Sequence, residues 1–212
     1  MRPWQRGVGL LELLLALALG LMLLAGASQL FTSAHRAWQL QGAALRMQED
    51  ARLALLRMAQ DVRMAGMFGC LRLEPADMPD DDTLVAFGRP LEVEDSGLTA
   101  VVADLPGHSL KPQWTLLTDC LGYAKVHRGH VQVAAPLMAI PITRHRYAVK
   151  DATLYFTRGS STQPLLEHVR RLHVVAAADG QRIDLHLDLF DPVLVLEQQY
   201  VVSVARRNGV EP

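Results

Sequence analysis

The sequence predicts an α+β protein in which a long amino-terminal helix packs on an antiparallel β-sheet. An apolar run begins close to the amino terminus, and a stripe of apolar residues at helical spacing follows it, with no proline between residues 4 and 74. Nearer the carboxyl terminus, apolar and polar residues alternate in short runs separated by turn residues, which is the pattern of half-buried strands. A helix and a sheet that each have one apolar face bury both faces by packing together.

The first half of the predicted helix is apolar on all sides. Between Val8 and Ala34 the only formal charge is Glu12. As a helix, residues 8–31 would measure roughly 36 Å, which is enough to cross a bilayer. Arg2 and Arg6 precede this run and place the short amino-terminal side in the cytoplasm. We therefore expect residues 8–34 to form a transmembrane helix, with the body of the chain on the other side of the membrane.

The second half of the helix, residues 35–67, has one apolar stripe. Arg57 and Asp61 lie four residues apart outside the stripe and can pair weakly. Gly66 and Gly69 are expected to end the helix. Because the stripe lacks a sustained heptad of leucine or isoleucine, we expect it to pack on a globular body and not in a coiled coil. Its members recur every three or four residues: Leu40, Ala44, Met47, Ala51, Leu55, Met58, Val62 and Ala65.

Residues 68–212 are expected to form the sheet domain. An acidic, proline-containing loop at residues 74–82 comes first. Asp179-Gly180 is a strong hairpin signal between two strands, and Asp191-Pro192 separates the last two. We expect one antiparallel sheet of four or more strands with its apolar face on the helix. The clearest strands are residues 152–157, 172–177, 182–189 and 193–205.

The chain has only two cysteines, Cys70 and Cys120, and no C-x-x-C motif. If the body lies outside the cytoplasm, a disulfide between them is the natural interpretation. Closing a loop of about 50 residues would stabilise the fold by roughly 4 kcal/mol in the chain-entropy view. Two buried free thiols are the alternative.

Glu12 is the most informative residue, because a carboxylate at bilayer depth costs roughly 2.5–3.5 kcal/mol on insertion scales and usually has a specific partner. A short basic leader, then Gly7, then a glutamate at the fifth position of an apolar helix resembles the class III leader of type IV pilins and pseudopilins. Phenylalanine is more usual in that family at the place of Val8, and serine or threonine at that of Gly9.

This resemblance makes residues 1–7 a prepilin leader. It implies that a prepilin peptidase cuts between Gly7 and Val8 and that the new amine of Val8 is methylated. It also implies that Glu12 attracts the amino terminus of a neighbouring subunit during fibre assembly. An amine and a carboxylate, each costly alone in lipid, offset one another when two subunits dock.

Other stretches resemble the PilW-type minor pilins. They are Ala51-Arg52, Arg63-Met64-Ala65-Gly66, Gly69-Cys70, Asp119-Cys120, and the runs that begin at Arg146, Gln163 and Val201. The resemblance implies a pilin-like fold and a low-abundance subunit that primes pilus assembly near the tip. Its partners would be other minor pilins, the major pilin and the inner-membrane assembly platform. The subunit would lie first in the bacterial inner membrane, in contact with the lipid bilayer and with its sheet domain in the periplasm, and later in the pilus.

Two other functions remain open. A J-type minor pseudopilin of a type II secretion system has the same leader and fold, and a similar place at a fibre tip. An ordinary export signal with a cleavage site at Ala25-Gly26-Ala27, or a simple membrane anchor, would instead leave a periplasmic binding domain. Glu12 argues against the export signal because it interrupts the apolar region near its start.

No catalytic motif is present, and we expect neither an enzyme nor a cofactor. The chain has no G-x-S-x-G and no Walker loop, and no strand precedes Gly7-Val8-Gly9. The pair His127 and His130, with His108 or His145, is too loosely spaced for a zinc site to be the preferred interpretation. Clustered carboxylates in the acidic loop could bind calcium, but a solvated charged loop is the default. They are Asp77, Asp80, Asp81 and Asp82.

The charge balance does not favour a nucleic-acid partner. The formal net charge is −1, and no nucleic-acid-binding motif accompanies the arginines near the carboxyl end. Such a group more often forms a solvated face or a subunit contact. It consists of Arg170, Arg171, Arg206 and Arg207.

Overall fold

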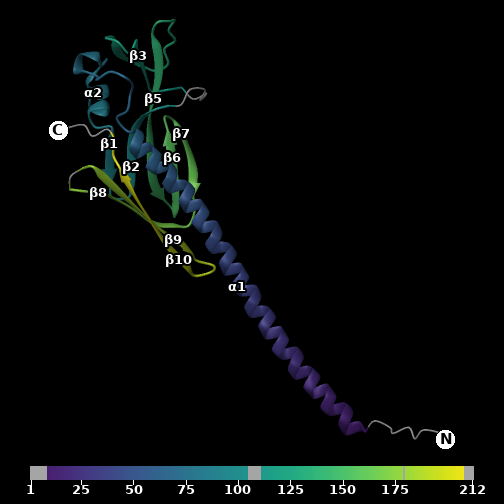
Figure 1. The fold of residues 1–212 in the computed structure, drawn as a ribbon. Helices are drawn as coiled ribbons and strands as arrows, with labels where there is room; N and C mark the ends of the chain where they lie inside the picture. Colours follow the sequence, from purple (N-terminus) through teal and green to yellow (C-terminus); the bar gives the residue numbers. More distant parts are fainter. Residues whose placement is uncertain (1–8, 105–110, 179, 208–212) are drawn as a thin grey trace. The chain divides into compact units, whose positions relative to one another are not determined.

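A computed structural model describes residues 9–104, 111–178 and 180–207. The chain divides into two compact units, Met1–Arg46 and Met47–Pro212. The boundary between them falls within the long helix α1 (Leu10–Met64), which contributes to both units (Figure 1). Gly7 and Val8, the predicted processing positions, lie outside the described residues.

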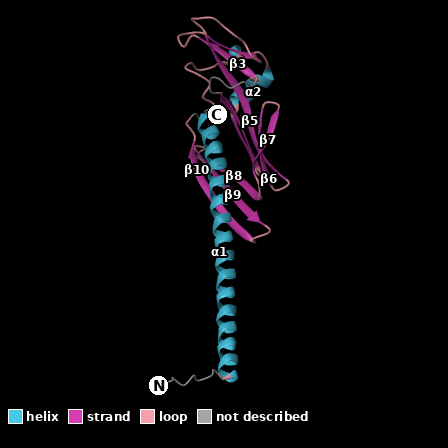
Figure 2. Cartoon of the chain, turned by 90° about the vertical axis from the view of Figure 1, so that its right-hand side faces the viewer, coloured by secondary structure: helices cyan, strands magenta, loops and turns pink. Residues whose placement is uncertain are grey.

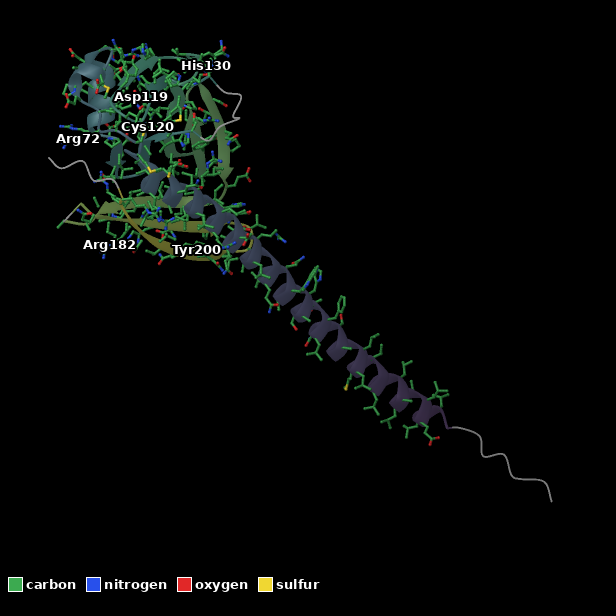
Figure 3. All side chains as sticks on the ribbon, turned by 45° about the horizontal axis from the view of Figure 1, so that its top comes forward. Arg72, Asp119, Cys120, His130, Arg182 and Tyr200 are labelled. Atoms are coloured by element: carbon green, nitrogen blue, oxygen red, sulfur yellow. A yellow bond between two sulfur atoms is a disulfide. The ribbon has the colours of Figure 1, made fainter. Side chains whose placement is uncertain are left out.

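In the first unit, α1 begins at Leu10 and its residues up to Gln41 are exposed. Its side chains are mostly hydrocarbon, as the green sticks along this part of the helix show (Figure 3). By length and composition the helix can cross a membrane, and it is the only described one that can. A long apolar amino-terminal helix is therefore present, as the sequence predicts.

The helix ends where the glycines predict. Its last residue is Met64, and Gly66 follows with a φ of 80°, a left-handed conformation that favours glycine. The backbone N–H of Gly66 donates to the carbonyl oxygen of Val101 at 3.3 Å. This hydrogen bond ties the end of the helix to the second strand of the sheet.

Among the described residues, the second unit contains two short helices and ten strands. The 3-10 helix is Pro75–Asp77, and α2 is Asp81–Gly88. The strands are β1 (Leu91–Glu94), β2 (Gly97–Ala103), β3 (Trp114–Thr118), β4 (Ala124–Arg128), β5 (Met138–Lys150), β6 (Thr153–Arg158), β7 (Ser161–Leu166), β8 (Val169–Ala176), β9 (Arg182–Asp191) and β10 (Leu196–Ala205).

These strands form two antiparallel sheets, where the sequence predicts one. The seven-stranded sheet has the order β1-β2-β5-β3-β4, with β6 pairing β5 and β7. The three-stranded sheet has the order β10-β9-β8. The chain leaves the first sheet after β7: His168 takes a left-handed φ of 62°, and β8 then pairs with β9 instead of β7. The predicted hairpin between β8 and β9 is confirmed.

Both sheets share one core with the second half of α1. Figure 2 shows β8, β9 and β10 beside this helix. The helix stripe and the inward residues of both sheets belong to a single cluster. The predicted stripe is therefore confirmed from Met47 onward. Its buried helical members are Met47, Ala51, Ala54, Leu55, Met58, Ala59 and Val62.

A second, smaller cluster lies under α2. Phe87 of α2 packs against Phe68 and Trp114, with ring centroids 4.3 and 5.6 Å apart. The indole Nε1 of Trp114 donates to Oγ1 of Thr83 at 3.0 Å, so the buried N–H is satisfied. The acidic loop predicted at residues 74–82 is thus corrected: it contains the 3-10 helix and the start of α2.

Candidate functional site

Glu12 lies in the first turn of α1 and is exposed. No described residue forms an ion pair with its carboxylate. A lone charge on an apolar helix is stable in water but not in a bilayer, so a membrane or fibre environment would have to supply a partner. The helix therefore presents Glu12 in a position to accept one.

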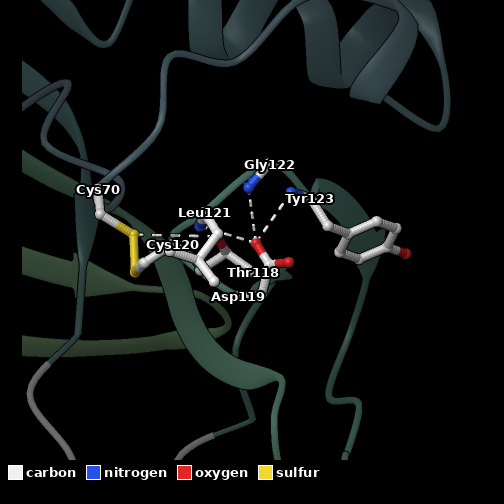
Figure 4. Close-up of a disulfide and its surroundings, with 7 residues drawn as sticks. All are labelled: Cys70, Thr118, Asp119, Cys120, Leu121, Gly122 and Tyr123. Carbon is white, nitrogen blue, oxygen red and sulfur yellow. Dashed lines mark hydrogen bonds between the residues drawn. A yellow bond between two sulfur atoms is a disulfide. The ribbon is translucent and has the colours of Figure 1, made fainter.

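The disulfide joins Cys70, just after α1, to Cys120, in the turn after β3 (Figure 4). The Cα atoms are 5.4 Å apart and the sequence separation is 50. The predicted pairing is confirmed, and the free-thiol alternative is excluded. The bond fastens the segment that leaves the helix to the larger sheet.

Asp119 organises the turn that carries Cys120. One oxygen of its carboxylate accepts hydrogen bonds from the backbone N–H groups of Leu121, Gly122 and Tyr123, at 2.9, 3.0 and 2.9 Å (Figure 4). These bonds stabilise the ionised carboxylate and lower its pKa to about 2. Cys120 itself has a left-handed φ of 59°, and its N–H donates to Oγ1 of Thr118 at 3.0 Å. These hydrogen bonds hold the turn in a conformation that places Cys120 within bonding distance of Cys70.

A buried ionic cluster, here called the Asp61–His145 cluster, joins α1 to the larger sheet. It comprises Asp61, Asp104, His145, Tyr147 and Arg158. Oδ2 of Asp61 accepts from the Tyr147 hydroxyl at 2.6 Å and lies 2.8 Å from Nδ1 of His145. On the far side of the imidazole, Nε2 is 3.6 Å from Oδ1 of Asp104, an ion-pair distance too long for a hydrogen bond.

Asp104 completes the cluster. Its Oδ2 lies 2.8 Å from a terminal guanidinium nitrogen of Arg158 and accepts from the Thr143 hydroxyl. Burial alone would raise the pKa of Asp104, but the nearby imidazole of His145 and the bonds from Arg158 and Thr143 outweigh burial and lower the pKa to about 2. Asp104 is therefore ionised at neutral pH.

The two carboxylates control the charge of the imidazole. Burial alone would lower the pKa of His145, but the nearby carboxylate of Asp104 and the hydrogen bond and negative charge of Asp61 outweigh burial and raise the pKa above the ordinary 6.5. The pKa of Tyr147 is raised by burial and by the charge of Asp61. The cluster thus favours a protonated His145 and a neutral Tyr147.

Arg57 does not pair with Asp61, which corrects the pair predicted from their spacing. Asp61 is taken by His145 and Tyr147, and the guanidinium of Arg57 lies over the Phe156 ring, 3.9 Å from its centroid. A cavity of about 270 Å³ opens here between α1 and strands β2, β5 and β6. Its charged lining residues are Arg57, Asp61, Asp104, His145 and Arg158.

Three of the four carboxylates considered for calcium, Asp77, Asp80 and Asp82, have partners in the fold. The guanidinium of Arg128 bonds Asp80 at 2.6 and 2.8 Å and Asp82 at 2.9 Å. Asp80 also caps α2 by accepting from the N–H of Thr83 at 2.9 Å, and Asp77 accepts from the N–H of Glu74 at 2.7 Å. The Arg128 bonds, with the Thr83 bonds, lower the pKa of Asp80. These side chains fasten α2 to the end of β4.

The histidines proposed for zinc do not converge with a third ligand. His127 is on β4 and His130 follows it, whereas His145 belongs to the Asp61–His145 cluster. His108 lies outside the described residues. In the part of the chain that the structure describes, no three histidine, cysteine or acidic side chains are placed to hold a metal ion.

The arginines considered for nucleic acid include two with partners in the fold. Arg170 bonds Glu197 at 2.9 Å across the three-stranded sheet, and the Arg206 guanidinium donates to the Gly180 carbonyl at 3.2 Å. Arg171 and Arg207 are exposed. The four side chains are therefore divided between structural contacts and open surface.

Sequence reasoning missed the Asp61–His145 cluster. One signal was present: His145 and Tyr147 are two residues apart, so they share a face of any strand that contains them. From the sequence, Asp61 is expected on the polar side of a helix. Its partners, His145 and Tyr147, lie 84 and 86 residues away along the chain. Nothing in the local pattern connects them.

Comparison with known proteins gives no match: no family model, no curated protein and no solved structure is significantly similar to this chain. Arguments about function therefore rest on the sequence and on the geometry above.

Proposed function

We propose that this chain is a minor pilin of the PilW type, which primes type IV pilus assembly within a tip-associated complex of minor pilins. One observation carries the proposal. Glu12 lies in the first turn of a 55-residue helix whose first half is apolar and whose second half packs on antiparallel sheets, and Gly7 precedes Glu12 by five residues in the sequence. A binding domain that is only anchored in a membrane needs neither Gly7 nor a glutamate at the depth of the bilayer.

In this proposal the parts of the chain divide the work. The apolar half of α1 holds the subunit in the membrane and later packs among the helices of the fibre. Glu12 attracts the methylated amine of a neighbouring subunit, since opposite charges at low dielectric attract strongly. The sheets and their loops supply the contacts that select the neighbouring minor pilins.

The intact mass of the membrane-purified protein, with its amino-terminal peptide sequenced, tests the proposal. We expect a chain that starts at methylated Val8. A start at Ser28 would indicate an exported periplasmic protein, and an intact Met1 an uncleaved anchor; either result contradicts the proposal.

The same mature amino terminus would fit a minor pseudopilin, because the leader and the helix are common to both classes. Co-purification separates them. Recovery with pilus subunits supports the proposal. Recovery only with secretion-system components would instead identify the chain as a minor pseudopilin.

A further inference from the structure

The cavity beside the Asp61–His145 cluster has one unmatched cation. Arg158 is matched by Asp104, and His145 lies between Asp61 and Asp104. Arg57, in contrast, contacts the face of Phe156 and forms no ion pair with any described residue. With His145 protonated, the five charged groups that line the cavity sum to +1.

One lining residue also has a donor without an acceptor. Nε of Arg158 is buried and makes no hydrogen bond with the described residues, whereas Nε2 of His145 faces the carboxylate of Asp104 at 3.6 Å. The side chain of Arg158 is only 10% exposed. A buried N–H without an acceptor is costly, so such groups normally bond to water or to a ligand.

We propose that this cavity binds a carboxylate group, held by the guanidinium of Arg57 and by the Nε–H of Arg158. A planar guanidinium fork matches the two oxygens of a carboxylate, and such charge-assisted bonds are stronger than neutral ones. A cation fits less well, because both Asp61 and Asp104 already accept bonds from protein groups. The carboxylate can come from a small free acid or from an acidic side chain of another protein.

Calorimetric titration of the full chain in detergent micelles tests this site. Acetate is the first probe, with chloride at equal ionic strength as the reference. We expect saturable binding of acetate that the variant Arg57→Gln weakens about tenfold or more, the effect of losing a hydrogen bond to a charged group.

The matched control is Arg52→Gln. Arg52 lies on the same helix, with its side chain 62% exposed and 3.3 Å from Glu49, so this variant should bind acetate as the wild type does. Arg57→Lys keeps the charge but loses the guanidinium fork, and it should bind with intermediate affinity. This variant provides the test if Arg57→Gln does not fold, as judged by circular dichroism.

A second probe distinguishes the source of the carboxylate. It is a glycine-glutamate-glycine peptide with both ends blocked, so that its only carboxylate is the side chain. Binding of the peptide and acetate points to an acidic side chain of another protein, and binding of acetate alone points to a free acid. Absence of saturable binding by the folded wild type, or equal affinity in the Arg57 variants, overturns the proposal. Binding here does not depend on pilus assembly.

Discussion

At the scale of single residues, Asp61 shows how one helical side chain can join two layers. It lies on α1 and accepts bonds from Tyr147 and His145, both on β5. A carboxylate buried without partners would cost several kcal/mol, whereas one with two strong donors is tolerated. The rotation of the second half of α1 about its axis is therefore specified by polar bonds in addition to apolar packing.

The titration of His145 gives a pH dependence with a definite sign. The charged or polar groups around its ring are Asp61, Asp104, Tyr147, Arg57 and Arg158. Because its pKa is raised above 6.5 in the folded state, the stabilisation is complete below pH 6.5 and is lost as the pH rises through the folded pKa. We expect the free energy of unfolding of the full chain, measured with urea in detergent, to fall as the pH rises above 6.5.

The variant His145→Gln isolates this effect. Its unfolding free energy should lose most of that slope, whatever its absolute stability. His130→Gln changes an exposed histidine and should keep the slope of the wild type. A wild-type slope retained in His145→Gln would show that another group is responsible.

At the scale of elements, the sequence pattern predicts the long helix and those strands that bury only one of their two faces. The stripe of α1 follows the helical period, and β9 alternates buried and half-buried residues along most of its length. Residues 98–102 of β2 and all of β3 are buried throughout, so neither strand shows an alternation. The short helix α2 was missed although Asp80 as cap and an acidic first turn are signals of a helix start, because its eight residues are too few to show a helical period.

Neighbouring leucines on α1 test the packing of the stripe. Leu55 is 2% exposed inside the main cluster, whereas Leu56 is 47% exposed. We expect Leu55→Ala to lower the free energy of unfolding by about 3 kcal/mol, the usual cost of a cavity in a core. Leu56→Ala should change it by less than about 1 kcal/mol.

Urea unfolding of the full chain in detergent measures both variants. The two substitutions remove the same atoms at adjacent positions, so differences in helix propensity cancel. Equal losses would mean that the second half of α1 does not bury the face described above.

At the scale of the whole molecule, the proposed function depends on the charge of Glu12, which no described residue pairs with. Glu12 is exposed on an apolar helix, and the second unit has its own core, built around Met47 and the residues that follow. Removing the Glu12 carboxylate should therefore affect association between subunits and leave the folding of the second unit unchanged.

If the proposed function is right, Glu12→Ala should still be cleaved after Gly7 but should be incorporated into fibres several-fold less, because the docking charge is lost. Quantitative immunoblots of sheared fibres and of membranes measure both properties. Glu49→Ala removes an exposed carboxylate from the second half of the same helix and should assemble normally. Normal incorporation of Glu12→Ala would remove the docking role.

The cysteine pair has a consequence for how the chain matures. With only two cysteines in the sequence, oxidation has a single intramolecular product, so no disulfide isomerase has to correct a wrong pairing. Wrong disulfides between two copies of the chain remain possible, and their yield rises with protein concentration. Asp119 and Thr118 shape the turn around Cys120. Formation of the Cys70–Cys120 disulfide is therefore fastest relative to linkage between molecules once that turn has formed. The chain should therefore reach its correct oxidised form more efficiently at low protein concentration than at high concentration.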